Sequence, residues 1–454
     1  MSGSCSRAPT TFRCLPSPVG RPNATSSPNA AATTGCLVEL NGDSGAALAV
    51  ARKSLGYDRR RGVVRWVCHA MPRPDRHAVD LTEDRTMQTD LQTANPLPMP
   101  APRPGRWANA NELPVIDFAP VSGKNEEAIE RVAREVHDAC RDIGFLTIVN
   151  HPVPPEKIRA IFEASRRFFA LPLAAKMHAY MGNSNLFRGY LPMDEPGQQP
   201  DFRGKAIEGF QPHLDPARMK ARKPHLNEAF QASLELPPDD PDVLAGKPLH
   251  GQNLWPENLP GFRETVLDYH TTMTGFAALL ASVFARGLKL PPDYFAQFYR
   301  KPLIQVRLLH YLPQDTQAAL EGGDSRAHQD GGGFTMLQQD DVGGLEIKSK
   351  SGQWLIVPPV ENSFVVNIGD SMRMWTNNRF ASTLHRVVNH YGRERYSVGV
   401  FANPDYDTVI RPLPTCVDTQ HPPTFDQMLS GEAMLFLYSR VWPSKGEPDK
   451  VSGY

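Results

Sequence analysis

Seven short apolar segments between residues 303 and 401 constrain the fold more than any other feature of the chain. Glycine, asparagine or aspartate residues lie between successive segments. The predicted strands are residues 304–309, 334–337, 344–347, 354–357, 363–368, 384–389 and 396–401. Strands of this length and spacing are typical of an antiparallel β-sandwich or barrel.

The stretch before these strands predicts a mixture of helices and strands. Residues 113–118 and 145–149 are short apolar runs that indicate strands. Between them a helix is expected to begin near Asn125 and to end near Gly144, because these residue types are common start and stop signals. Apolar residues recur in this helix at a spacing of three and four: Ile129, Val132, Ala133, Val136, Ala139 and Cys140.

Two further helices are expected before the seven strands. One opens at Pro154-Pro155, since proline is tolerated in a first helical turn, and a long one covers residues 260–288. Residues 178–252 are rich in glycine, proline, asparagine and aspartate and are expected to be irregular. The prediction is a mainly β fold with flanking helices. An N-terminal α/β region covers 112–250, and a helix plus the strand-rich domain covers 251–440.

The first 105 residues are rich in serine, alanine, arginine and proline and lack a sustained apolar period. Such a segment buries too little apolar surface to offset its ordering entropy, so 1–105 is predicted to be a disordered extension. A mis-annotated start, with translation beginning near Met87, is the second interpretation. A targeting peptide is the third, although the apolar core of a secretory signal is missing.

The overall charge gives no sign of a polyanionic partner. The chain has 49 Lys and Arg against 49 Asp and Glu, which argues against nucleic-acid binding by phosphate neutralisation. No run approaches the ~18 consecutive apolar residues that span a bilayer, so no membrane contact is expected. Six cysteines without a C-x-x-C pair are typical of a reduced, cytoplasmic protein.

One residue separates His328 from Asp330, and Gly331-Gly332-Gly333 follow. On a strand, residues i and i+2 face the same side, so both side chains would point into one space. His385 lies 55 residues after Asp330, within an apolar run. Two imidazoles and one carboxylate form the facial triad of non-haem Fe(II) sites, which leaves coordination positions open for a co-substrate and O2.

A second polar pair, Arg395 and Ser397, begins ten residues after His385. Both residues would share one face of the last predicted strand. A guanidinium group binds a carboxylate through two parallel hydrogen bonds, and a neighbouring hydroxyl adds a third. A candidate metal triad followed by a candidate carboxylate receptor is a more specific signal than either motif alone.

In this order and at this spacing, the motifs resemble those of the Fe(II)- and 2-oxoglutarate-dependent dioxygenases of the isopenicillin N synthase-like group. The resemblance covers about residues 112–440 and implies that the core of the fold is a double-stranded β-helix, or jelly roll. Further matching motifs are Arg188-Gly189-Tyr190, Gly261-Phe262-Arg263, Gln338-Gln339-Asp340-Asp341, Asn367-Ile368-Gly369-Asp370 and Ser430-Gly431-Glu432.

The resemblance implies a role for each residue of the two central motifs. His328, Asp330 and His385 would bind Fe(II). Arg395 and Ser397 would hold the distal carboxylate of 2-oxoglutarate, whose keto-acid end chelates the iron. O2 would be the second co-substrate.

Other positions match the family less closely. Tyr311 stands where the family has a tyrosine that also contacts 2-oxoglutarate. Leu309 stands where many plant members have asparagine, which is a departure in the same pocket. Phe401, Arg307 and Phe210 are candidate contacts for the oxidised substrate.

The activity that the resemblance implies is hydroxylation, desaturation or ring closure of a small molecule. This would be coupled to the conversion of 2-oxoglutarate and O2 to succinate and CO2. The iron centre would carry the chemistry, and no separate acid or base residue is proposed. The sequence does not name the substrate and leaves the oligomeric state open, with a monomer slightly favoured because many relatives act as monomers.

Three alternative functions remain open at this point. The first is an oxidase of the same fold that uses no 2-oxoglutarate, as isopenicillin N synthase does. The second is a non-catalytic ligand-binding protein, which the intact triad counts against. The third is a zinc hydrolase, because two histidines and a carboxylate also hold catalytic zinc, but it leaves Arg395 and Ser397 unexplained.

Overall fold

The computed structural model describes residues 36–40, 47–58, 63–70, 105–193, 227–313, 327–389 and 392–441. Contacts divide the chain into two units, Met1–Ala94 and Asn95–Tyr454. Three strands of the first unit pair antiparallel in the order β1-β2-β3: β1 (Cys36–Leu40), β2 (Ala47–Asp58) and β3 (Val63–Ala70). The expected disordered extension or later start for 1–105 stays a prediction, and Met87 and Phe210 lie outside the described residues.

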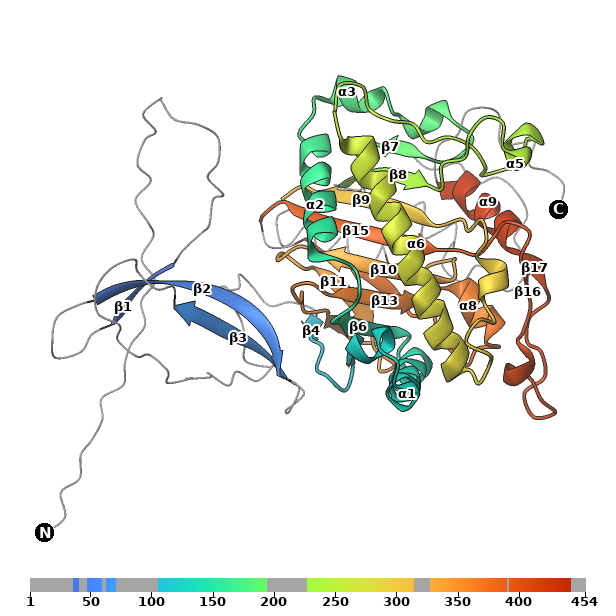
Figure 1. Cartoon of the computed structure of the whole chain (residues 1–454), viewed down its shortest axis with the longest axis horizontal. Coiled ribbons are helices and arrows are strands. Elements are labelled where there is room, and N and C mark those ends of the chain that lie inside the picture. Colours follow the sequence, from blue (N-terminus) through green and yellow to red (C-terminus); the bar gives the residue numbers. More distant parts are fainter. Residues whose placement is uncertain are drawn as a thin grey trace, which may run out of the picture. The chain divides into compact units, whose positions relative to one another are not determined.

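An eight-stranded sheet forms the centre of the second unit (Figure 1). Its strand order is β5-β6-β13-β10-β15-β9-β8-β7, and only β5 and β6 run parallel to each other. The strands are β5 (Val115–Asp117), β6 (Phe145–Val149), β7 (Gly189–Leu191), β8 (Asn227–Ser233), β9 (Gln305–Tyr311), β10 (Phe334–Gln339), β13 (Phe364–Ile368) and β15 (Arg395–Ala402). The sheet takes strands from both predicted regions, 112–250 and 251–440, and that division stays a prediction.

A four-stranded sheet of order β14-β11-β12-β4 packs on one part of the large sheet. Its strands are β4 (Gly105–Trp107), β11 (Leu345–Lys348), β12 (Trp354–Ile356) and β14 (His385–Val387). Ile347 and Leu355 from this sheet form one apolar cluster with Phe145 and Val365 from β6 and β13. Two mainly antiparallel layers packed in this way confirm the predicted jelly-roll core.

Three helices cover the other face of the large sheet (Figure 1). They are α1 (Glu126–Asp142), α2 (Pro155–Phe169) and α6 (Phe262–Gly287). Val306, Leu308, Met336 and Val400 belong to the apolar core beneath the helices. Because side chains alternate along a strand, the residues between them face the opposite, inner side of the sheet. That inner side carries the candidate site.

The remaining elements are short and connect or cover the sheets. The helices and short helical turns are η1 (Ala119–Ser122), α3 (Leu173–Met177), η2 (Met181–Asn183), α5 (Pro241–Leu244), η3 (Ala296–Phe298), α8 (Asp370–Trp375), η5 (Pro414–Cys416) and α9 (Ser430–Val441). The strands β16 (Val409–Ile410) and β17 (Met428–Leu429) form a separate pair.

The predicted helices and the seven predicted strands are present. The Asn125 side chain caps α1 by accepting a hydrogen bond from the Ala128 amide, and all six predicted apolar residues of this helix are buried. The helix stops at Gly144, whose positive φ of 70° is accessible to glycine at little cost. Pro155 begins α2, and α6 lies inside the predicted range 260–288.

The expectation that residues 178–252 are irregular is wrong in part. This stretch contributes β7 and β8 to the large sheet and also forms α5. The sequence of β8, Asn-Glu-Ala-Phe-Gln-Ala-Ser, lacks the β-branched residues that usually indicate a strand. Pairing with β9 on one side and β7 on the other, rather than local propensity, makes it a strand.

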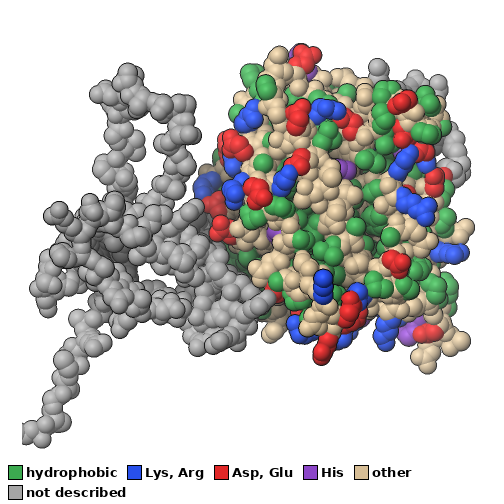
Figure 2. Space-filling view, in the orientation of Figure 1, with side chains coloured by type: hydrophobic (Ala, Val, Ile, Leu, Met, Phe, Trp, Pro, Cys, Tyr) green, Lys and Arg blue, Asp and Glu red, His purple; other side chains and the backbone are tan. Residues whose placement is uncertain are grey.

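Figure 2 shows Lys and Arg side chains interspersed with Asp and Glu on the visible face. This mixture is consistent with the formal net charge of zero. Across the described residues, no helix is both long enough and apolar enough to cross a membrane.

Candidate active site

Two backbone segments bring the predicted metal ligands together. His328 and His385 exchange a pair of backbone hydrogen bonds, each 2.9 Å long, in an isolated bridge. Asp330 follows in an irregular loop, so the expectation that His328 and Asp330 share a strand is wrong. The strand β10 begins only at Phe334.

The three predicted ligands converge despite this difference. Their candidate ligand atoms all lie within 4.8 Å of one another. Asp330 Oδ1 is 3.7 Å from His328 Nε2 and 3.7 Å from His385 Nε2. Within the described ranges, this is the one group of three or more His, Cys, Asp or Glu residues placed to hold a metal. A donor set of two imidazoles and one carboxylate fits Fe(II) and leaves coordination positions open.

The Asp330 carboxylate is held by two neutral donors. Its Oδ2 accepts hydrogen bonds from Thr335 Oγ1 at 2.5 Å and from Asn367 Nδ2 at 2.7 Å. Oδ1 therefore faces the imidazoles. Burial raises the pKa of this carboxyl group, but His385, His328 and the two hydrogen bonds outweigh burial and lower the pKa overall. The group is thus kept in the ionised form that a metal requires.

His385 is oriented by its other ring nitrogen. Nδ1 lies 3.1 Å from the Thr383 carbonyl oxygen, which can only accept a hydrogen bond, so Nδ1 carries the proton. Nε2 is then the unprotonated nitrogen that can bind a metal. Phe145 packs edge-on against the imidazole, with ring centroids 5.4 Å apart.

Backbone contacts fix the loop that carries Asp330. The Asp370 amide at the start of α8 donates to the Asp330 carbonyl at 2.7 Å. A Cβ atom on Gly332 would lie 1.9 Å from Asn403 Oδ1, so a larger residue does not fit without a shift. Gly332 therefore lets the loop lie close to the Asn403 side chain.

Replacing Asn367 with alanine is expected to weaken Fe(II) binding by roughly 10–100-fold, because Asp330 loses a hydrogen bond that orients it. Fe(II) titration of the apo-protein under anaerobic conditions measures the effect. Asn253→Ala is the matched control, since Asn253 is a buried residue whose side-chain amide bonds only the Ser233 backbone. Equal Fe(II) affinity in Asn367→Ala and wild type would contradict the orienting role.

The predicted carboxylate receptor is buried on the inner side of β15. Arg395 is fully buried, and its Nη1 donates to Ser397 Oγ at 2.9 Å. Its Nη2 donates to Gln339 Oε1 at 3.1 Å, and its Nε donates to the Gly343 carbonyl. The guanidinium plane is therefore fixed before any ligand binds.

Tyr311 lies directly opposite Arg395 in the pairing of β9 with β15. The Arg395 guanidinium carbon is 4.6 Å from the centre of the Tyr311 ring, a cation–π contact. Leu309 lies opposite Ser397. The structure therefore brings Tyr311 to the receptor, as the sequence resemblance predicts, and places the departing residue Leu309 beside it.

The metal triad and the receptor face the same space. Thr335, which bonds Asp330, is paired with Phe401, and Gln339 is paired with Ser397. Paired residues in an antiparallel sheet point to the same face. A ligand that bridges the triad and Arg395 would thus lie on the inner side of the large sheet.

Several residues that hold the site were not assigned a role from the sequence. Thr335, Asn367 and Gln339 orient the predicted ligands. Asn367 and Gln339 belong to motifs of the family pattern, whereas Thr335 belongs to none of the quoted motifs. Asp340 is also near the receptor, where its carboxylate accepts hydrogen bonds from the Tyr396 and Val342 amides. Burial raises the pKa of the Asp340 carboxyl group, although Arg395 partly opposes this.

Two of the three candidate substrate contacts lie within the residues that the structure describes. Phe401 and Arg307 lie on the inner side of β15 and β9 and are half-buried. Arg307 Nη1 donates to Gln231 Oε1 at 3.2 Å. Phe210 lies outside the described residues.

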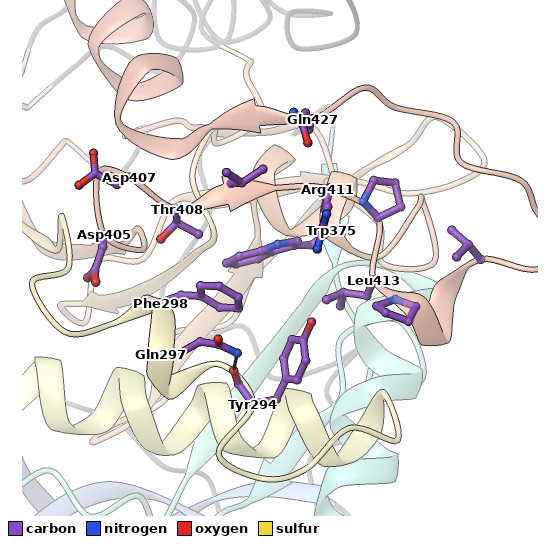
Figure 3. Close-up of a pocket in the computed structure, with 14 residues that line it drawn as sticks. Tyr294, Gln297, Phe298, Trp375, Asp405, Asp407, Thr408, Arg411, Leu413 and Gln427 are labelled. Carbon is purple, nitrogen blue, oxygen red and sulfur yellow. Dashed lines mark hydrogen bonds between the residues drawn. The ribbon is translucent and has the colours of Figure 1, made fainter.

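A cavity of about 770 Å³ lies elsewhere, between η3, α8 and the β16 region (Figure 3). Tyr294, Phe298 and Trp375 form its aromatic wall, and Asp405 and Asp407 lie near its rim. None of the predicted site residues lines it. The convergence of ligand atoms, rather than the size of this cavity, identifies the candidate active site.

Two family models match the chain. Residues 113–258 match the N-terminal domain described as "non-haem dioxygenase in morphine synthesis", and residues 303–404 match the 2OG-Fe(II) oxygenase superfamily. The second range contains the metal triad and the receptor.

Curated relatives match over most of the chain. The 2-oxoglutarate-Fe(II) type oxidoreductase hxnY of Emericella nidulans is 33% identical over 74% of this chain and 93% of its own length. Kihadalactone A synthase of Citrus sinensis is 30% identical over 73% of this chain and 95% of its own length.

A solved structure with the same fold is that of a full-length Neurospora crassa protein in complex with alpha-KG. It has a TM-score of 0.60 and 25% identity, over 72% of this chain and 97% of that chain. The matched domains, the identity to curated relatives and the converging triad agree. The chain belongs to the Fe(II)- and 2-oxoglutarate-dependent oxygenases, a family of oxidoreductases that use Fe(II), 2-oxoglutarate and O2.

Proposed function

We propose that this chain oxidises a small-molecule substrate and couples the oxidation to conversion of 2-oxoglutarate and O2 to succinate and CO2. The outcome for the substrate is hydroxylation, desaturation or ring closure. One observation carries the proposal: a triad whose ligand atoms lie within 4.8 Å of one another shares the inner side of the sheet with a buried, pre-formed carboxylate receptor.

In this proposal His328, Asp330 and His385 hold Fe(II). Arg395 and Ser397 bind the distal carboxylate of 2-oxoglutarate. A bidentate guanidinium–carboxylate contact adds direction as well as affinity, so it would select a dicarboxylic keto acid.

The chain's own contribution is to position reactants and to exclude side reactions. When bound, Fe(II) and 2-oxoglutarate supply the redox chemistry that lets O2 oxidise a C–H bond. Asn367 and Thr335 hold Asp330 so that one oxygen faces the metal position. Gln339 and the Gly343 carbonyl hold the Arg395 guanidinium in plane, so no reorganisation is needed when the carboxylate arrives.

Tyr311 completes the co-substrate site from the neighbouring strand. Its ring lies over the Arg395 guanidinium and limits where the bound carboxylate can lie. Leu309 opposite Ser397 gives this part of the site an apolar wall.

Phe401, Arg307 and Phe210 are the residues proposed to contact the oxidised substrate. Phe401 offers a ring face, and Arg307 offers donors on the next strand of the same inner side. We also place the chain in the isopenicillin N synthase-like branch, on the order and spacing of its motifs, and in the cytoplasm, on its cysteine pattern.

An anaerobic titration tests the co-substrate assignment. Apo-protein is given Fe(II) and then 2-oxoglutarate, and the visible spectrum is followed for a metal-to-ligand charge-transfer band. The band is expected only when both are present, followed by succinate release once O2 is admitted. Bound iron without a band would favour the oxidase that uses no keto acid. No iron binding would favour the zinc hydrolase or the ligand-binding protein.

A further inference from the structure

Strands β9 and β15 carry the proposed co-substrate site on their inner side. On their opposite face they carry a second pair of facing residues. Tyr311 is paired with Arg395 on the inner side, while the neighbouring His310 is paired with Tyr396 on the side covered by helices. The two pairs are therefore directly adjacent along each strand. Any movement of β9 relative to β15 at this point displaces both pairs.

His310 and Tyr396 are stacked ring on ring. Their centroids are 4.6 Å apart, and their planes differ by 15°. Phe169 at the end of α2 contacts both rings, with centroid distances of 5.4 Å to His310 and 6.4 Å to Tyr396. Burial, followed by the nearby Glu394, raises the pKa of Tyr396 to about 12, so its ring stays neutral.

A buried carboxylate fixes the other edge of His310. Glu228 on β8 accepts from His310 Nδ1 at 2.9 Å, from Lys176 Nζ at 2.6 Å and from the Tyr190 hydroxyl at 2.5 Å. Glu228 and His310 are 2% and 6% exposed. Although burial raises the pKa of Glu228, these three donors outweigh it and lower the pKa overall. We call Glu228, His310, Lys176 and Tyr190 the Glu228 cluster.

The Glu228 cluster links four elements behind the co-substrate site. Lys176 comes from α3, Tyr190 from β7, Glu228 from β8 and His310 from β9. Apolar residues of similar volume usually stabilise a core at least as well as a buried ion pair, because ions are costly to desolvate. What a polar cluster adds is a defined geometry, since each hydrogen bond has a required direction.

We propose that His310 is a positioning residue for 2-oxoglutarate binding. Held by Glu228 and stacked on Tyr396, it fixes β9 against β15 and thereby keeps the Tyr311 ring over the Arg395 guanidinium. This inference rests on the proposed role of Arg395 and Tyr311 as the co-substrate site. It adds a residue that touches neither the metal nor the ligand.

Three variants separate the stack of His310 on Tyr396 from its hydrogen bond to Glu228. His310→Leu removes both the stack and the hydrogen bond, His310→Phe keeps a ring for the stack, and His310→Asn keeps a donor near Nδ1 for Glu228. The probe is 2-oxoglutarate, titrated anaerobically into the Fe(II)-loaded full chain. His310→Leu is expected to weaken 2-oxoglutarate binding roughly tenfold, with smaller losses in the other two variants and Fe(II) affinity unchanged in all three.

His270→Leu is the matched control. His270 on α6 is also buried and bonds one backbone carbonyl, that of Ile304, at 3.0 Å. It is expected to lower the melting temperature while leaving 2-oxoglutarate affinity as in wild type.

These measurements distinguish failure of the His310 positioning role from failure of the proposed co-substrate site. If Arg395→Ala binds 2-oxoglutarate like wild type, the co-substrate assignment itself fails. If Arg395→Ala loses binding but His310→Leu does not, only the positioning role is overturned. If His310→Leu does not fold, wild-type affinity in both His310→Phe and His310→Asn overturns the proposal, and weakened affinity at unchanged Fe(II) affinity supports it.

Discussion

Asp330→Ala is expected to abolish turnover while the protein stays folded. Asp330 supplies the only carboxylate of the described triad, and two imidazoles alone do not make a facial three-point site. Removing it leaves Thr335 and Asn367 without their acceptor, which costs about 1–3 kcal/mol per buried group. Loss of a carboxylate that is costly to bury offsets part of this, so the metal-free variant is expected to melt at a somewhat lower temperature than wild type and still to be folded.

Two measurements separate metal loss from unfolding. Fe(II) at 100 times its Kd should stabilise wild-type protein by about 2.7 kcal/mol, whereas Asp330→Ala should show no shift in melting temperature with Fe(II). Asp330→Asn is the closest variant in shape, since its amide oxygen can still accept from Thr335 and Asn367. It is expected to have a wild-type circular dichroism spectrum and no succinate release.

Asp405→Asn is the control for a lost structural carboxylate. Asp405 is partly buried and accepts from the Lys301 and Arg300 amides, away from the triad. This variant is expected to be less stable than wild type and still to bind Fe(II). Full activity in Asp330→Ala would end the assignment of the metal centre.

The elements with a clear apolar period could be predicted from the sequence. For α1, the 3.6-residue pattern, the Asn125 cap and the Gly144 stop agree, and local signals of this kind need no knowledge of distant contacts. The seven strands between residues 303 and 401 are bounded by turn residues and are equally local.

Other parts depend on contacts that the sequence does not display. The strand β8 has no β-branched residue and exists because β7 and β9 pair with it. The loop around His328 looks like a strand by alternation, but its glycines pack against Asn403 and α8 instead. Such outcomes are decided by tertiary packing rather than by local propensity.

The candidate ligands could be predicted, but the residues that orient them could not. His328, Asp330, His385, Arg395 and Ser397 are chemically distinctive at a readable spacing. In contrast, an amide or hydroxyl such as those of Asn367, Thr335 and Gln339 is common in any strand, and its role appears only once its partner is known. The same holds for His310, whose partners come from two other strands and a helix.

Arg395→Ala is expected to remove the preference for 2-oxoglutarate over keto acids that lack the distal carboxylate. In the proposed site, the buried guanidinium and Ser397 bind that carboxylate, which 2-oxobutyrate does not have. Losing one partner of a buried charge-assisted contact costs about 2–5 kcal/mol, which is roughly 30-fold to several thousand-fold in Kd. The 2-oxobutyrate affinity should change much less, because its keto-acid end would still reach the metal.

Three further variants, compared with the same two ligands, isolate the contact. Arg395→Lys keeps a charge but cannot reproduce the three directed hydrogen bonds of the guanidinium. Its 2-oxoglutarate affinity should therefore lie between those of wild type and Arg395→Ala. Ser397→Ala removes one neutral donor and should weaken 2-oxoglutarate binding less than Arg395→Ala or Arg395→Lys. Arg188→Lys is the matched control, since Arg188 is a buried arginine that bonds only backbone carbonyls, those of Leu234, Leu249 and Gly251.

The ratio of the two dissociation constants decides between the remaining functions. A wild-type preference for 2-oxoglutarate that disappears in Arg395→Ala and persists in Arg188→Lys means that the buried guanidinium reads the distal carboxylate of the co-substrate. A wild-type protein that binds 2-oxoglutarate and 2-oxobutyrate equally well would mean that Arg395 and Ser397 serve another carboxylate. In that case the substrate itself would carry the carboxylate, as expected for an oxidase that uses no keto acid, while the metal triad would keep its role.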